Sequence, residues 1–281
     1  MLLDDGAEPN RVGGAGCPPL TIASHAGAAA GVAMLLAHGA AIDARDANGA
    51  SALQAAAFGG RVRTLRLLLQ AGAPAHAMDH VGRNAAHYAA CSNSVSCLNA
   101  LRKAGVDLQA ETSFGWTPVH MAANHSCVGA MAMLLRSKQC PPHGHDTAGW
   151  TPLHLAAHRL GCGTDGCTCR RCTRLHHRRS KCMRLLLEHG APVDAPDERH
   201  ATAAHLAAAH DDPEGLRLLR AHRADLWAGD RDGQTPMRIA RQHHQPSRFV
   251  RTLLMLSDGS AGRRDGEGET PAAAGEDDQL A

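Results

Sequence analysis

Cysteine, histidine and arginine are concentrated in one stretch of the chain, residues 158–184. Five of the ten cysteines lie in the 21 positions from 162 to 182, where an even distribution would place about 0.75. Thiolates and imidazoles are the ligands that zinc prefers, usually four in a tetrahedron. The pattern therefore predicts one structural zinc ion, which would order a stretch with almost no apolar side chains.

The spacing of these residues suggests which of them hold the ion. Cys169 and Cys172 have the C-x-x-C spacing of a chelating loop, Cys167 lies two residues earlier, and Cys182 can close the site. Four further residues can substitute for any of these, namely Cys162, His158, His176 and His177. Two alternatives stay open: a solvated loop with reactive thiols, and disulfides if the compartment is oxidising.

The same stretch is strongly basic. Up to residue 182 it holds one acid, Asp165, against seven cations: Arg159, Arg170, Arg171, Arg174, Arg178, Arg179 and Lys181. Such a lobe can meet phosphates or an acidic protein surface. It has no aromatic residue on which single-stranded bases could stack. A solvated run of charge is the alternative, and the acidic end of the chain could also fold back onto it.

Outside this stretch the chain is repetitive. A leucine-like landmark recurs at Leu20, Leu53, Ala86, Val119, Leu153, Ala204 and Met237, with spacings of 33, 33, 33, 34, 51 and 33. A second landmark, Leu-Leu-x-x-Gly-Ala, has its glycine 19 residues after the first landmark in the first three copies and 37 residues after it in the fifth. The fifth copy therefore carries an insertion of 18 residues between its two landmarks.

Residues 115–123 (GWTPVHMAA), 149–157 (GWTPLHLAA) and 185–194 (LLLEHGAPVD) closely resemble the ankyrin-repeat family. The resemblance implies an all-α solenoid of stacked helical hairpins, with about seven copies over residues 11–256 and the insertion at 158–184 within the fifth. Residues 1–10 match only the second helix of a further copy. Residues 257–281 carry seven acids and two arginines, a net charge of −5, and predict a disordered tail.

The motif residues have simple structural roles. Thr151 can cap the first helix, Pro152 suits its first position, and Gly190 can end the second helix with a positive φ. The family resemblance implies that the motif histidines His87, His120, His154 and His205 form hydrogen bonds between adjacent copies. The predicted structural motif comprises Thr117, Pro118, His120, Thr151, Pro152, His154, Thr202, His205, Thr235 and Pro236.

The resemblance implies a non-enzymatic scaffold, such as an adaptor or a pathogen-type effector, that binds a protein through first helices and turn tips. The candidate anchors are Phe114, Trp116, Asn124, His125 and Trp150. Alternatively, Trp116 and Trp150 pack between neighbouring turns. The chain has no G-x-S-x-G, no H-E-x-x-H, no kinase signature and no phosphate-binding loop motif.

A nucleic-acid or chromatin-associated factor, which would use the basic insertion, is the alternative function. The N-terminus has acids where a signal peptide has basic residues, and no apolar stretch approaches the roughly 20 residues that span a bilayer. We therefore expect no membrane partner and a location inside the cell, in the cytoplasm, the nucleus or both.

Overall fold

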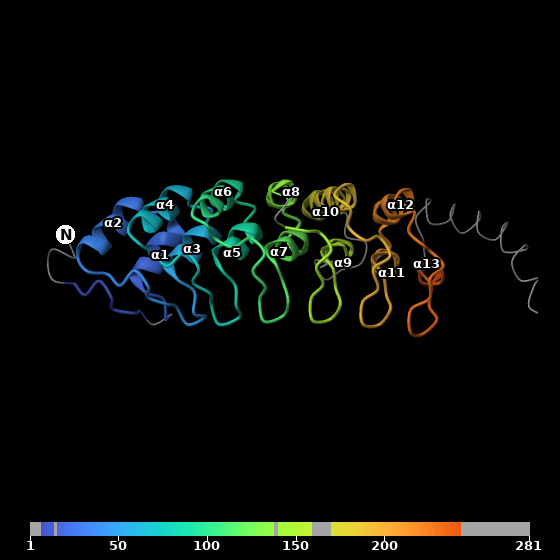
Figure 1. Ribbon diagram of the computed structural model, residues 1–281, viewed down its shortest axis with the longest axis horizontal. Helices are drawn as coiled ribbons and strands as arrows, with labels where there is room; N and C mark the ends of the chain where they lie inside the picture. The colour runs from blue at the N-terminus through green and yellow to red at the C-terminus, as the bar shows by residue number, and fades with distance from the viewer. Residues whose placement is uncertain (1–6, 14–15, 138–139, 159–169, 243–281) are drawn as a thin grey trace, which may run out of the picture.

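A computed structural model describes residues 7–13, 16–137, 140–158 and 170–242, although for residues 170–176 only the helical backbone is described. The predicted tail at 257–281 and most of the predicted partial copy at 1–10 lie outside the described residues. The rest is a row of helical hairpins that stack side by side into an elongated solenoid (Figure 1). The prediction of an all-α repeat architecture is confirmed.

Each hairpin has a short first helix and, except in the last copy, a described second helix. The first helices are α1 (Pro19–Ala26), α3 (Ala52–Phe58), α5 (Ala85–Cys91), α7 (Pro118–Asn124), α9 (Pro152–Ala157), α11 (Ala203–Ala209) and α13 (Pro236–Arg241). The second helices are α2 (Ala29–Ala37), α4 (Val62–Gln70), α6 (Val95–Lys103), α8 (Val128–Arg136), α10 (Arg170–Glu188) and α12 (Pro213–Ala221). The second helices form the upper row in Figure 1 and the first helices the row below.

The loops that join each second helix to the next first helix extend beyond the helices and form the lower edge in Figure 1. We call them the finger loops, and they comprise residues 38–51, 71–84, 104–117, 137–151, 189–202 and 222–235. The glycines that end the second helices, such as Gly72 and Gly190, have φ of +87° and +83°. Because only glycine adopts such angles at little cost, it ends the helix where the loop begins.

The predicted repeat register matches the helices. Each of the seven landmarks from Leu20 to Met237 is the second residue of a first helix, and each is at most 3% exposed. The second helices bury apolar pairs three residues apart, such as Leu65 with Leu68 and Leu98 with Leu101. Since neighbouring hairpins contact each other through these residues, one apolar core runs through the stack.

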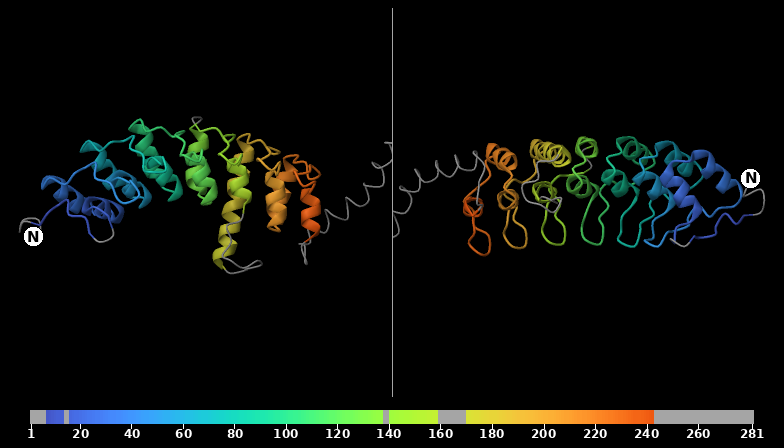
Figure 2. Two further views of the ribbon diagram at one scale, coloured as in Figure 1. Left: turned by 90° about the horizontal axis from the view of Figure 1, so that it is seen from below. Right: turned by 180° about the vertical axis from the view of Figure 1, so that it is seen from behind.

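The fifth second helix differs from the others in length. α10 has 19 residues, whereas α2, α4, α6, α8 and α12 have nine each. The view from below in Figure 2 shows α10 reaching past its neighbours. The expectation that the insertion would be a loop unable to order itself is therefore wrong for residues 170–179. These residues contain no Gly or Pro, and adding turns to a helix already anchored in the core costs little.

Candidate functional site

The finger loops share one hydrogen-bonded turn. Asp146 Oδ1 accepts from the backbone N–H of Ala148 (2.9 Å) and of Trp150 (2.8 Å). The side chains of Asp46, Asp79, Thr112, Asp197 and Asp230 accept in the same way from the backbone two and four residues ahead. A short polar side chain that binds its own loop holds the turn without help from the core.

Backbone hydrogen bonds also join one finger loop to the next. The N–H of Thr147 donates to the carbonyl of Phe114 (3.0 Å), and that of Glu198 donates to the carbonyl of Ala148 (3.2 Å). Equivalent bonds join the other described neighbouring loops from residue 48 to residue 231. The finger loops are therefore held in a row of defined spacing.

Trp116 and Trp150 are half-buried at the bases of their finger loops. The indole Nε1–H of Trp116 donates to Asp146 Oδ2 (2.9 Å), and that of Trp150 donates to Asp197 Oδ2 (3.1 Å). Each indole thus binds the turn aspartate of the next repeat. This geometry supports the alternative that the two tryptophans pack between neighbouring turns, because their polar groups are engaged within the fold.

The motif histidines connect adjacent repeats. His154 Nδ1 accepts from the Thr151 N–H (3.1 Å), so the proton is on Nε2, which donates to the Ala201 carbonyl (3.1 Å). His87 and His205 make the same bonds to Trp116 and Gln234. His120 shares the Nδ1 bond, but its buried Nε2 has no acceptor with hydrogen-bond geometry among the described residues.

Burial keeps three of these imidazoles neutral. Removal from water lowers the pKa of His87 and of His154, and it lowers the pKa of His120 to about 4. A neutral, fully hydrogen-bonded imidazole is a structural group. His87 and His154 therefore hold adjacent repeats together and leave recognition to other residues.

The exposed side of the first helices carries an aromatic cluster. The fourth residue of a first helix lies about 200° around the helix axis from the buried landmark, so it faces away from the core. The seventh residue lies on the same face of the helix as the fourth. Ile22 and His25 of α1, Phe58 of α3 and Tyr88 of α5 occupy these positions. Ile22 is 56% exposed and Phe58 is 47% exposed. We call these four residues the first-helix patch.

Ring contacts make the first-helix patch continuous. The centroids of His25 and Phe58 are 5.7 Å apart, and those of Phe58 and Tyr88 are 6.0 Å apart in an edge-to-face arrangement. Tyr88 in turn donates its hydroxyl to Asp79 Oδ2 (2.7 Å) and lies beneath the Arg83 guanidinium (4.9 Å to the ring centroid). The patch therefore extends from the helices to the finger loop at 71–84.

The other predicted anchors lie apart from the first-helix patch. Phe114 is 59% exposed at a finger tip, and Trp227, which was not predicted, is 53% exposed in the loop at 222–235. His125 is exposed and Asn124 half-buried at the end of α7. Among the described residues, this side of the molecule offers a partner the first-helix patch, the two exposed finger aromatics and Met78, which is 49% exposed in the finger loop at 71–84.

The proposed zinc ligands are only partly described. Cys162, Cys167 and Cys169 lie outside the described residues, and the side chains of Cys172 and His176 are not described. His158 is half-buried, with its ring 5.1 Å from Trp150 and 5.0 Å from His210, while His177 is exposed. The described part of the chain contains no group of three His, Cys, Asp or Glu residues that could hold a metal ion.

Cys182 is poorly suited to close a zinc site. It is fully buried on α10, and burial raises the pKa of its thiol to about 12. The last nine residues of α10 match the nine-residue second helices of the other repeats, and Cys182 is the third residue of this segment. The third residues of α4, α6 and α8 are Thr64, Cys97 and Ala130, and all four side chains are fully buried. A small residue is needed there because it faces the core, so Cys182 packs as an apolar side chain.

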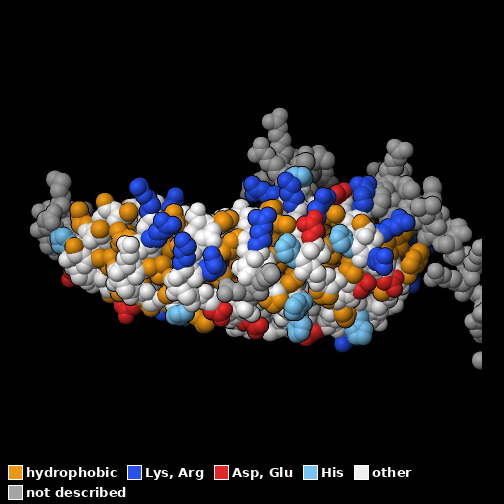
Figure 3. Space-filling model, turned by 45° about the horizontal axis from the view of Figure 1, so that its top comes forward, with side chains coloured by type: hydrophobic (Ala, Val, Ile, Leu, Met, Phe, Trp, Pro, Cys, Tyr) orange, Lys and Arg blue, Asp and Glu red, His pale blue; other side chains and the backbone are white. Residues whose placement is uncertain are grey.

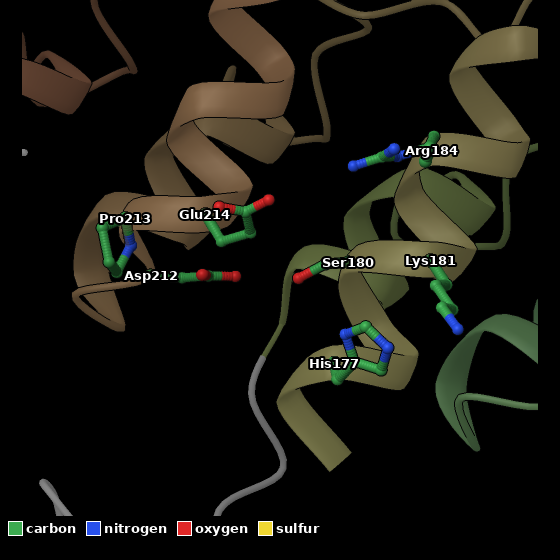
Figure 4. A pocket seen from close by; sticks show the side chains of 7 residues that line it. All are labelled: His177, Ser180, Lys181, Arg184, Asp212, Pro213 and Glu214. Atoms are coloured by element: carbon green, nitrogen blue, oxygen red, sulfur yellow. The ribbon is translucent and has the colours of Figure 1, made fainter. Parts of the chain in front are cut away.

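A shallow cleft lies between α10 and α12. His177, Ser180, Lys181 and Arg184 line it on α10, and Asp212, Pro213 and Glu214 line it at the start of α12 (Figure 4). Arg184 and Glu214 point toward each other across the opening. The cleft is shallow and its side chains carry both charges, without the large hydrophobic side chains typical of a small-molecule site.

Comparisons with known proteins identify the fold. Models of ankyrin repeats in three copies match residues 1–79, 20–112 and 86–165, a single-repeat model matches 148–198, and a many-copy model matches 186–240. The chain belongs to the ankyrin-repeat family. No curated protein sequence matches it. Ankyrin repeats are general protein-interaction modules, so the family supports a protein-binding role.

Solved ankyrin domains resemble the whole stack. The human ASB11 ankyrin repeat domain is 26% identical, with a TM-score of 0.70, over 92% of this chain and 100% of that one. The ankyrin repeat domain of Bcl-3, a member of the IkappaB protein family, is 27% identical, with a TM-score of 0.63, over 85% and 99%. Among the described residues, no helix is long and apolar enough to cross a membrane.

Proposed function

We propose that this ankyrin stack is a scaffold or adaptor that binds a protein partner through the first-helix patch and the finger tips. The observation that carries the proposal is the row of contacting rings His25, Phe58 and Tyr88 on three neighbouring first helices, beside which Ile22 is exposed. Exposed aromatic side chains on a rigid scaffold are good binding anchors, because they bury a large area at little entropic cost.

The polar groups beside the patch support recognition of a peptide or protein surface. Tyr88, Asp79 and Arg83 form a linked group in which Arg83 Nε lies 2.6 Å from Asp79 Oδ2. This network fixes the Tyr88 ring before a partner arrives, which lowers the entropy lost on binding. Phe114 and Trp227 extend the surface along the finger loops.

Affinity capture with matched variants tests the proposal. The purified protein is immobilised as wild type, as Ile22→Ser with Phe58→Ser, and as Met34→Ser with Val95→Ser. The last pair removes exposed apolar side chains from the second helices α2 and α6. All samples are treated with nuclease, and the captured proteins are quantified by mass spectrometry.

We expect a defined set of proteins that wild type and the Met34/Val95 variant retain equally and that the Ile22/Phe58 variant loses at least about tenfold. Equal retention by all three proteins would remove the first-helix patch from the proposal. Equal loss by both variants would point to general surface hydrophobicity as the cause. Far-ultraviolet circular dichroism checks that each variant is folded.

The insertion is the second part of the proposal. We propose that Cys167, Cys169 and Cys172 hold one zinc ion, with Cys162 or His176 replacing Cys182 as the fourth ligand. The burial of Cys182 supports this revision, as does the concentration of these four cysteines and His176 within 15 residues, 162–176. The role would be structural, joining the start of α10 to the stretch before it.

A further inference from the structure

Charge is separated across the solenoid. The six second helices contain 14 Arg or Lys residues and two acids, Glu188 and Glu214. Two of the cations lie on each of α4, α6 and α12, one on α8 and seven on α10. By contrast, the sequences of the finger loops contain 12 acids and six Arg or Lys residues.

The cations of the second helices form one surface. These helices lie side by side, and the side chains of Arg63, Arg66, Arg102, Lys103, Arg136, Arg178, Lys181, Arg184, Arg217 and Arg220 are exposed. Figure 3 shows blue Lys and Arg side chains along the row of second helices and several red Asp and Glu side chains near the opposite edge. We call this basic row, from α4 to α12, the second-helix ridge.

The residue types on the second-helix ridge fit phosphate. Twelve of the 14 cations are arginine, whose planar guanidinium binds phosphate oxygens through two parallel hydrogen bonds. A partly neutralising contact is the ion pair of Arg217 with Glu214 at 2.9 Å. The mixed-charge cleft occurs at the same end of the row, so the positive field is least opposed over α4, α6 and α8.

The surroundings of these cations distinguish among polyanions. None of the second helices contains Phe, Tyr or Trp, so no platform is present for stacking single-stranded bases. Among the second-helix side chains that the structure describes, the large exposed apolar ones are Met34 and Val95, which are too few to anchor a helix in a lipid interface. A duplex needs neither feature, because its phosphates are reached from outside.

We propose that the second-helix ridge binds duplex nucleic acid through the phosphate backbone, without reading base sequence. Packed helices lie about 8–10 Å apart, so the four steps from α4 to α12 cover roughly 32–40 Å. A duplex rises about 3.4 Å per base pair, so this length corresponds to roughly 9–12 base pairs. The surface lies on the opposite row from the first-helix patch, so it is independent of the proposed protein partner.

Fluorescence anisotropy with a duplex of about 20 base pairs tests the inference. One variant carries Arg66→Glu, Arg102→Glu and Arg136→Glu on α4, α6 and α8. The matched control reverses the same number of exposed charges away from the ridge, with Arg199→Glu, Arg231→Glu and Arg238→Glu. Both are measured near 0.15 M salt, where screening beyond about 8 Å suppresses the effect of net charge alone.

We expect wild-type affinity to fall steeply with salt, the ridge variant to bind at least about tenfold more weakly, and the control to stay within about twofold. Equal losses in both variants would overturn the inference, as would equal or tighter binding of a single strand of the same length. No change in the ridge variant would mean that these cations serve only helix ends and solvation. Tighter binding to anionic vesicles than to the duplex would also refute the proposal. Thermal melting checks that each variant is folded.

Discussion

Replacing His154 tests the hydrogen bonds that hold the stack across the insertion. Its imidazole is buried and joins Thr151 of its own hairpin to Ala201, which lies 47 residues after His154. His154→Ala leaves the Thr151 N–H and the Ala201 carbonyl without these partners. Each buried unsatisfied group costs about 1–3 kcal/mol, and the lost ring adds a cavity, so we expect a loss of about 3–5 kcal/mol.

The second repeat supplies the matched control. Gln54 occupies the histidine position there, and its Oε1 accepts from the Ser51 N–H while its Nε2 donates to the carbonyls of Ala77 and Arg83. A glutamine can therefore make both kinds of bond. We expect His154→Gln to cost about 1 kcal/mol or less, because the backbone groups keep their partners.

Urea titration followed by circular dichroism measures both variants against wild type. Because repeat stacks can unfold in parts, hydrogen exchange at α9 and α11 checks where protection is lost. If glutamine costs as much as alanine, the hydrogen bonds are not what the histidine supplies. If alanine costs less than about 1 kcal/mol, the joint between these two repeats does not depend on this residue.

Three further predictions follow from the described geometry. Burial lowers the pKa of His120 to about 4, so the unfolded chain binds the proton more tightly and stability falls as the pH drops below about 6.5. For His120 alone, we expect urea titrations to show a loss of about 2 kcal/mol between pH 7.5 and pH 5. A urea midpoint that does not change with pH would contradict this. Elemental analysis will find about one zinc per chain, absent after Cys169→Ser with Cys172→Ser, and its absence from wild type would remove the site. Cys182→Ser will retain the metal but lower stability by about 1–3 kcal/mol, because a hydroxyl enters an apolar core; loss of zinc in this variant would restore Cys182 as a ligand.

The repeat register could be read from the sequence because its signals are local. A threonine at the cap, a proline or small residue after it and a glycine at the end of the second helix fix helix ends without reference to the rest of the chain. Thr151 indeed accepts from the His154 N–H at 3.4 Å, and Gly190 has φ of +83°. Repetition of these signals at 33 residues then predicts the stack.

The insertion was harder to predict because two tendencies compete there. Its shortage of apolar residues favours disorder, whereas the absence of Gly and Pro after residue 169 favours extension of the following helix. Cys182 is a second case, because its place near the other cysteines predicts a metal ligand whereas its position in the repeat is buried. Comparison with Thr64, Cys97 and Ala130 at the same repeat position would have shown that it faces the core.

The first-helix patch was missed because its members are far apart in the sequence. Ile22, Phe58 and Tyr88 stand singly in alanine-rich helices, and only the side-by-side stacking of α1, α3 and α5 brings them together. Alignment of the fourth and seventh positions of each first helix would have exposed the pattern. The tryptophans before Thr-Pro attracted attention instead, although their indoles are used within the fold.

The most direct test of the protein-binding proposal places a photo-crosslinking amino acid, p-benzoylphenylalanine, at position 58 on the first-helix patch. The matched protein carries it at position 34, which is similarly exposed on the opposite row. Irradiation in nuclease-treated cell extract, followed by mass spectrometry, identifies what each position touches. The proposal predicts a discrete protein adduct from position 58 and none from position 34. The same adducts from both positions, or an adduct from position 34 alone, would contradict it.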